Sequence, residues 1–90
     1  MELTAHEARL KKLRMRSWRR GMKEMDLILG PFADAELVGL SPDVLDAYER
    51  LLDENDQDLY LWVTGAVPCP EALHPMISRI STAVGAGATK

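Results

Sequence analysis

Residues that commonly carry chemistry are scarce in this sequence. It has one cysteine, Cys69, and two histidines, His6 and His74. A single cysteine excludes an intramolecular disulfide framework. Because Cys69 lies between two prolines with no second cysteine nearby, it is more typical of a free structural thiol than of a nucleophile. Neither histidine has a His or Cys neighbour at the spacing of a metal site, so we predict no bound metal.

Long hydrophobic runs are absent too. The longest stretch without a charged residue, residues 59–70, has 12 residues, whereas a membrane-spanning helix needs about 20. The first seven residues lack the apolar region of a secretory signal. Two early glutamates, and a single serine before residue 40, are unlike a transit peptide. We therefore expect a cytoplasmic protein.

Two segments have only a weak similarity to ligand-binding loops. Gly85-Ala86-Gly87 follows no strand, so it does not match a nucleotide-binding loop. An EF-hand starting at Asp53 would need Gly at its sixth position and Glu at its twelfth, where this sequence has Asp58 and Thr64. We predict no catalytic, metal-binding or cofactor-binding residues. We therefore expect a protein that is not an enzyme and that binds no cofactor tightly.

The composition is that of one small folded domain. The 90 residues are 47% hydrophobic and 28% charged, as in ordinary globular proteins. No segment alternates apolar and polar residues for long enough to form a half-buried strand. We predict an all-α fold, a compact bundle of about five short helices. A single helical domain should cover residues 1–84, with a flexible C-terminal tail over residues 85–90.

Local signals predict where the helices begin and end. Thr4 and Glu7 form the pattern of a capping box, which predicts a first helix over residues 5–17 or 5–18. Gly21 predicts a break, because glycine is poor inside a helix and suits a positive φ. A second helix should begin near Met22. The pair Gly30-Pro31 predicts either a kink, with the helix continuing to residue 37, or an end and a restart.

The second half of the chain has clearer signals. Ser41-Pro42-Asp43 predicts a third helix, with serine as N-cap and proline in the first turn. Asp56 is predicted to cap a short fourth helix, and Gly65 suits the position after its end. A last helix should span residues 74–84. The predicted buried side of the fourth helix comprises Leu59, Trp62 and Val63.

Charge is divided unevenly along the chain. Residues 1–25 contain eight Lys or Arg and three Glu, whereas residues 26–90 contain three Lys or Arg and eleven Asp or Glu. This polarity indicates a charged docking surface. In a helix continuous over residues 9–23, basic residues would share one face and apolar residues another. The basic set is Arg9, Lys12, Arg16, Arg20 and Lys23, and the apolar set is Met15, Trp18, Met22 and Met25.

A short motif lies within this segment. Arg20-Gly21-Met22-Lys23-Glu24, followed by Asp26, resembles the hallmark of the succinate dehydrogenase flavinylation factors. These are small bacterial and mitochondrial proteins that assist covalent attachment of FAD to a dehydrogenase flavoprotein subunit. The resemblance covers about residues 12–80 and departs at Gln57 and Pro75. It continues through Leu27–Leu29, Pro31-Phe32, Leu40-Ser41, Arg50–Leu52, Asp56–Leu59, Trp62 and Pro68.

The resemblance implies an all-α protein that binds the flavoprotein subunit of succinate dehydrogenase, with fumarate reductase as a further candidate. FAD would then be the cofactor of the partner. In the motif, Gly21 would let a partner approach closely and Arg20 would offer planar donors to a carboxylate. Glu24 would orient that guanidinium or accept from the partner. The predicted partner-binding residues are Arg16, Arg20, Gly21, Met22, Glu24 and Asp26.

Other interpretations of the basic segment remain open at this point. It is also consistent with a solvated basic stripe opposite a core stripe, or with an antitoxin-like interaction module. A nucleic-acid-binding face is disfavoured by the net charge of −3, since such domains usually carry a positive field.

Overall fold

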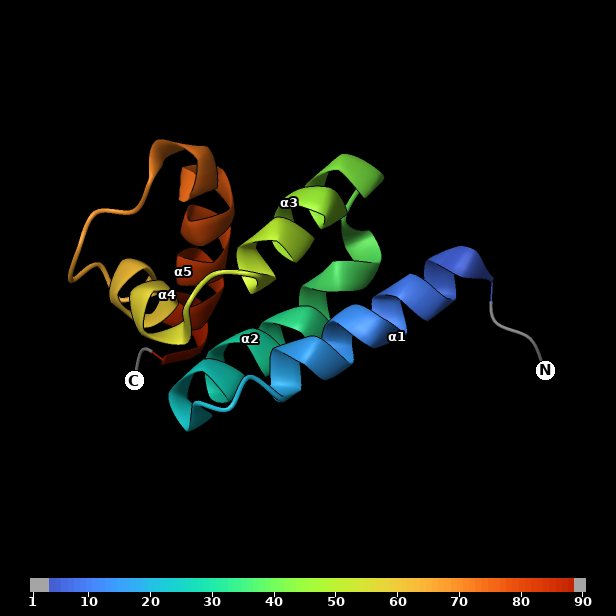
Figure 1. Ribbon diagram of the computed structural model, residues 1–90, viewed down its shortest axis with the longest axis horizontal. Coiled ribbons are helices and arrows are strands. Elements are labelled where there is room, and N and C mark those ends of the chain that lie inside the picture. The colour runs from blue at the N-terminus through green and yellow to red at the C-terminus, as the bar shows by residue number, and fades with distance from the viewer. Residues whose placement is uncertain (1–3, 89–90) are drawn as a thin grey trace.

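The computed structural model describes the backbone of residues 4–88 and the side chains of residues 4–84 (Figure 1). Within this range the protein is all-α and has no strand, as predicted. The helices are α1 (Ala5–Trp18), α2 (Lys23–Glu36), α3 (Pro42–Leu52), α4 (Asp56–Val63) and α5 (His74–Ala88). Two short 3-10 helices, η1 (Leu37–Gly39) and η2 (Glu71–Leu73), precede α3 and α5. None of these helices is both long and apolar enough to cross a membrane.

Side-chain caps explain where three helices begin. The capping box of Thr4 and Glu7 is present, and Ser41 caps α3 by accepting from the Val44 amide. The prediction that Asp56 caps α4 is wrong by one residue. The cap is Asn55, whose Oδ1 accepts from the Gln57 and Asp58 amides at 2.8 and 3.3 Å. The Asp56 carboxylate is therefore not used for capping, and it accepts a hydrogen bond from Nε of Arg20 instead.

Pro31 lies inside α2 without ending it. The helix continues to Glu36 and passes into η1, which settles the alternatives left open by Gly30-Pro31. Proline cannot donate to the carbonyl of Leu27. Because Leu27 and Pro31 are both exposed, water can satisfy that carbonyl on the outer side of α2.

The helices enclose one core. Figure 1 shows α1 and α2 side by side, with α3 beside them and α4 and α5 together at the other end. Ser17, the one buried polar side chain among the described residues, lies within hydrogen-bond distance of the Tyr48 hydroxyl at 2.6 Å. The Tyr48 ring stacks on Phe32 with the ring centroids 5.6 Å apart. The largest fully buried apolar side chains are Leu13, Met25, Leu29, Leu37, Leu45, Tyr48, Leu51, Leu59 and Ile80.

Gly30 has a packing role that its sequence context did not suggest. A Cβ atom at this position would lie 2.3 Å from Cδ2 of Trp18, far inside contact distance. The indole therefore packs directly on the α2 backbone, and its Nε1 donates to Oδ2 of Asp34 at 3.2 Å. Glycine at position 30 thus allows the close approach of α1 and α2.

The last helix differs from the prediction at its end. It begins at His74 as expected, with Pro75 tolerated in the first turn, where its missing N–H needs no partner. It runs to Ala88, so the predicted end at Val84 is wrong and the predicted tail begins inside α5. Residues 89 and 90 lie outside the described residues.

Trp62 is only half-buried, whereas the sequence predicted a largely buried side chain. It packs against the core from its edge, while Leu59 and Val63 are fully enclosed. In a helix of eight residues only a narrow side can face inward. A truncation at Trp62 should therefore cost less than the roughly 3–5 kcal/mol of a fully buried aromatic side chain.

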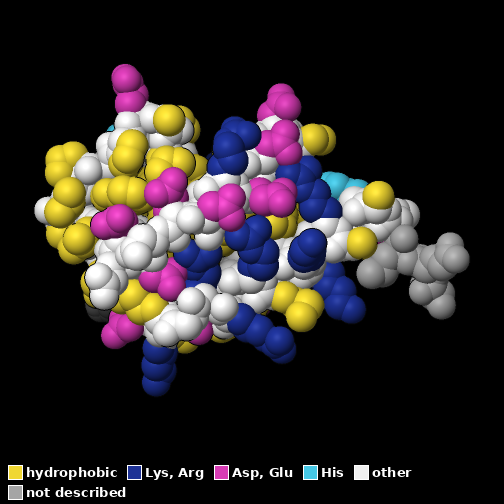
Figure 2. Space-filling model, viewed as in Figure 1, with side chains coloured by type: hydrophobic (Ala, Val, Ile, Leu, Met, Phe, Trp, Pro, Cys, Tyr) yellow, Lys and Arg dark blue, Asp and Glu magenta, His cyan; other side chains and the backbone are white. Residues whose placement is uncertain are grey.

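Part of the charge polarity is satisfied within the chain. Arg9 contacts Asp46 and Glu49 of α3 at 2.6 and 3.1 Å, and Arg16 contacts Asp53 at 2.9 Å. Figure 2 shows the Lys and Arg side chains of α1 beside acidic side chains on this face of the molecule. The basic stripe is therefore in part a contact between α1 and α3, and not a free docking surface.

Candidate protein-binding site

The turn between α1 and α2 is built around Gly21. Its φ is +95°, in the left-handed region that side-chain-bearing residues rarely adopt, which confirms the predicted need for glycine. An added Cβ atom would meet nothing within 4 Å. Glycine is thus required here by the backbone and not by crowding inside the chain. A side chain at this position would project into open space.

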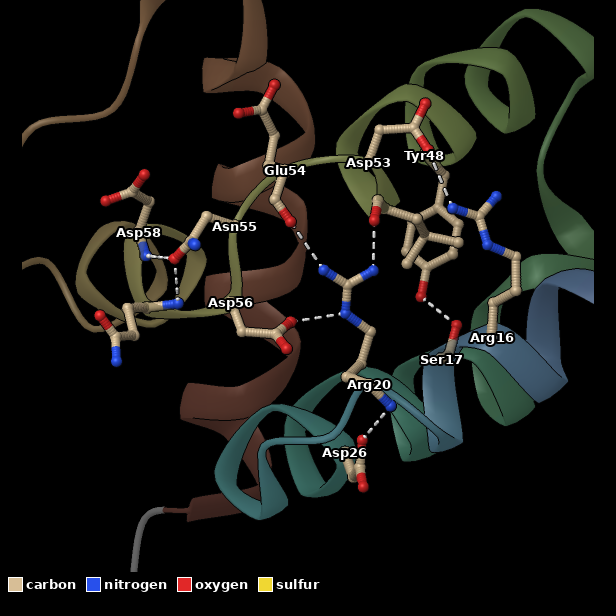
Figure 3. A network of polar contacts seen from close by, with 12 residues as sticks. Arg16, Ser17, Arg20, Asp26, Tyr48, Asp53, Glu54, Asn55, Asp56 and Asp58 are labelled. Carbon is tan, nitrogen blue, oxygen red and sulfur yellow. Dashed lines mark hydrogen bonds and ion pairs between the residues drawn. The ribbon is translucent and has the colours of Figure 1, made fainter.

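Arg20 joins this turn to the segment between α3 and α4 (Figure 3). Its Nε donates to Oδ1 of Asp56 at 2.6 Å and its Nη2 to the Glu54 carbonyl at 2.8 Å. Its Nη1 donates to the carbonyl of Leu52. The Arg20 side chain is only 10% exposed. We expected this guanidinium to be available to a partner's carboxylate, but the structure uses it to hold residues 52–56 against the turn.

Asp26 supports the same turn from the other side. Its Oδ1 accepts from the backbone N–H of Arg20 at 2.7 Å (Figure 3). The Asp26 carboxylate thus gives a hydrogen-bond partner to the backbone N–H of Arg20, which lies beyond the end of α1. Within the chain, therefore, Arg20 and Asp26 of the motif both shape the turn.

Arg16 lies on α1, four residues before Arg20, and contacts Asp53 at 2.9 Å. The two side chains are 34% and 72% exposed, so water screens this ion pair. Figure 3 shows Arg16 and Arg20 reaching the same segment from neighbouring positions. Arg16 was predicted as a partner-binding residue, and it lies at the border of the turn and not in the open depression described next.

An open depression of about 600 Å³ lies beside the turn. On one side it is lined by Gly21, Met22, Lys23 and Glu24, and on the other by Asn55, Asp56 and Gln57. Glu24 is exposed and makes no ion pair within residues 4–88. Of the two roles expected for Glu24, orienting Arg20 is taken by Asp56, and contact with a partner stays a prediction.

Sequence reasoning missed the contribution of residues 55–57 to this site. The resemblance did include Asp56–Leu59, but the local pattern identified that segment only as a helix start. The missing signal was the contact between Arg20 and Asp56, which are 36 positions apart. No local spacing rule reaches across that separation.

The depression is lined by polar and charged groups. Among the described residues, no three His, Cys, Asp or Glu side chains are grouped as a metal site would require. Tyr48, a buried core residue, does not line the depression. Burial raises its pKa to about 12, against the lowering effect of the Ser17 hydrogen bond. The depression offers backbone groups, the side-chain amides of Asn55 and Gln57, the ammonium of Lys23 and the carboxylate of Glu24.

Comparison with known proteins identifies the family. The model of the family described as flavinator of succinate dehydrogenase matches residues 11–84. The chain belongs to this family. The resemblance inferred from residues 20–26 is thereby confirmed. The match includes both sides of the depression, residues 21–24 and 55–57.

Individual relatives agree with the family match. Three proteins named succinate dehydrogenase assembly factor 2, mitochondrial, are similar to this flavinator-family chain. The protein of Mycosarcoma maydis is 41% identical over 66 residues, covering 73% of this chain and 28% of the relative. That of Penicillium rubens is 40% identical over 81 residues, covering 90% and 24%. That of Yarrowia lipolytica is 34% identical over 79 residues, covering 82% and 54%. The chain thus spans about half the length of these relatives or less.

Proposed function

We propose that this chain binds the flavoprotein subunit of succinate dehydrogenase and promotes covalent attachment of FAD to that subunit. The family description and the names of the relatives support this proposal. They give no support to the nucleic-acid-binding or antitoxin-like alternatives. The basic stripe on which those alternatives depended is largely paired: Arg9, Arg16 and Arg20 each contact an acidic side chain.

The structure of the turn at Gly21 supports placing the binding site there. The turn at Gly21 is held rigidly from within by Arg20 and Asp26, yet its outer side is open. A turn that is fixed and has no side chain lets a partner's backbone approach closely at low entropic cost. Glu24 and Met22 flank it in the depression and supply a charge and an apolar contact.

The chain acts in this proposal as a partner and not as an enzyme. By binding one arrangement of the flavoprotein preferentially, it raises the population of the arrangement in which the flavin and its attachment residue are close. FAD is bound by the flavoprotein, and this chain does not hold it tightly. A purified chain should show no flavin absorbance after size exclusion. The relatives are named mitochondrial, so the cytoplasmic location expected from the sequence stays a prediction.

The decisive experiment uses Gly21→Arg with a matched control. Gly65 has φ +82° and nothing within 4 Å of an added Cβ atom, so Gly65→Arg introduces the same strain and the same side chain. It lies after the opposite end of α4, about 12 Å from the end that lines the depression, at 1.5 Å of rise per residue. Gly21→Arg should abolish capture of the flavoprotein and its covalent flavinylation, and Gly65→Arg should not. If the two variants capture and flavinylate the flavoprotein equally well, the turn at Gly21 is not part of the binding site.

Glu24→Ala sharpens the same test. Because Glu24 is exposed and unpaired within residues 4–88, its removal should change the free energy of unfolding by no more than about 0.5 kcal/mol. Binding to the flavoprotein should nevertheless weaken. A folded variant with normal flavinylation would show that Glu24 does not contact the partner.

A further inference from the structure

A second open surface lies on the outer side of α1 and α2. We call it the outer patch and define it as Met15, Trp18 and Leu27. These side chains are 45%, 40% and 57% exposed, although each is large and apolar. Scattered exposed apolar residues are ordinary, but a contiguous group of them often marks an interaction surface.

Packing makes these three residues neighbours. The Trp18 ring lies on Gly30, within 2.6 Å of where a Cβ atom would be. Met15 is three residues before Trp18 on α1, and Leu27 is three residues before Gly30 on α2. Because the two helices run antiparallel (Figure 1), Met15 and Leu27 lie about one turn from the Trp18–Gly30 contact in opposite directions, with Trp18 between them. The bond from Trp18 Nε1 to Asp34 fixes the indole in place. The patch is therefore a fixed surface formed by two helices.

The charges around the outer patch are mainly positive. Lys11 and Arg14 precede Met15 and Trp18 by four residues on α1, so they border the same side. Arg19 follows Trp18, and Lys23 precedes Leu27 by four residues on α2. Within residues 4–88 none of these four cations makes an ion pair, in contrast to Arg9, Arg16 and Arg20. The carboxylate of Asp34 accepts a hydrogen bond from Nε1 of Trp18.

We propose that the outer patch docks an acidic segment of the flavoprotein subunit that presents an apolar side chain among carboxylates. This inference rests on the proposed function and extends its surface. Lys23 lines the depression at Gly21 as well as bordering the patch, so the two regions are continuous. An apolar centre with a charged rim is the usual anatomy of a protein interface, in which the centre sets affinity and the rim guides association.

Continuity with the depression and the size of the patch favour this occupant over other ones. In a second copy of the chain, Asp46, Glu49, Asp53 and Asp56 are paired with arginines, but Asp43, Asp58 and Glu71 are exposed, so the test below includes dimer formation as an outcome. A membrane surface is disfavoured because the patch has only three large apolar side chains and the chain has a net charge of −3.

The test compares two pairs of variants in binding to the purified flavoprotein subunit. Leu27→Glu places a charge in the outer patch, and Val38→Glu makes a similar change at a residue that is 71% exposed in η1. Lys11→Glu/Arg14→Glu reverses two rim charges, and Arg50→Glu/Arg79→Glu changes the net charge equally elsewhere. Thermal melting of each variant checks that it is folded. Affinity and its salt dependence are then measured for each.

The outer-patch variants should each bind about tenfold more weakly or worse, as expected for the loss of an interface centre or of complementary charges. The rim variant should also lose much of the salt dependence of binding. Both controls should stay within about twofold of the original affinity. Equal affinity for outer-patch variants and controls would overturn the inference, while Gly21→Arg would still report on the proposed function.

Three further outcomes would also overturn the inference. One is binding to phosphatidylcholine–phosphatidylglycerol vesicles that Leu27→Glu abolishes while flavoprotein binding is unchanged. Another is a dimer in sedimentation equilibrium that the same variant dissociates. The third is no binding of the original chain to the flavoprotein, which would remove the proposed function together with the patch.

Discussion

The two sides of α1 use the same kinds of residue in opposite ways. On the side facing α3, Arg9 and Arg16 contact acidic residues, and Arg20, just beyond the end of the helix, contacts Asp56. On the outer side, Lys11 and Arg14 make no ion pair within residues 4–88 and border an exposed Met15. Neighbouring elements, and not residue type, thus decide which cations are structural and which are available to a partner.

The largest expected change in stability is at Arg20, on the side of α1 that faces α3, which we call the paired side. Arg20→Ala leaves the Asp56 carboxylate and two carbonyls without their donor in a largely buried place. We expect a loss of about 2–4 kcal/mol of unfolding free energy, below the extreme for a buried pair because Asp56 lies at the N-terminus of α4. Urea denaturation measures it. An unchanged stability would mean that the contacts of Arg20 do not hold residues 52–56 against the turn.

On the outer side, Gly30→Ala should have the next largest effect. The new Cβ would overlap the Trp18 ring, so the indole must move away from α2. Overpacking of this kind costs about 1–3 kcal/mol, partly offset by about 1 kcal/mol from the better helix propensity of alanine. Thermal melting measures the change in stability. A red shift of Trp18 fluorescence, in a Trp62→Phe background, measures the displacement of the indole. Gly39→Ala is the control, since nothing lies within 4 Å there, and equal spectra would contradict the packing role.

The pH dependence of stability tests the buried contact between Tyr48 and Ser17 on the paired side. Its pKa is raised from 10.0 to about 12 by burial, so the folded state favours the neutral phenol. The resulting stability is fully present below pH 10 and is lost as the pH rises through about 12. Tyr48→Phe should cost about 1 kcal/mol at neutral pH by removing the bond to Ser17. Its stability should then fall less steeply than that of the original chain between these pH values, and parallel pH profiles would contradict the assignment.

Arg16 provides the smallest expected effect. Because its ion pair with Asp53 is largely exposed, Arg16→Ala should cost less than about 1 kcal/mol, and the difference should shrink at high salt. Lys11→Ala, the matched change on the outer side, should leave stability within about 0.5 kcal/mol. If the two variants are equally stable at low salt, the distinction between paired and unpaired cations rests on Arg20 and Arg9 alone.

Local chemistry was enough to predict much of the fold. The capping box at Thr4, the Ser41 cap, and the breaks at Gly21 and Gly65 all act over three or four residues, so the sequence displays them directly. The prediction was wrong where two signals were adjacent, as at Asn55 and Asp56, and where a helix continued past a weak end at Val84.

By itself the sequence determined the family, the all-α class and the need for glycine at the turn, because each depends on a short pattern of residues. Only the tertiary structure decided what the motif residues contact. Arg20 meets Asp56 across 36 positions, and Gly30 is adjacent to Trp18 because two helices pack closely there. Contacts of this kind depend on how helices pack. A one-dimensional pattern of charges therefore shows that a surface is basic, but not which of its cations the rest of the chain has already paired.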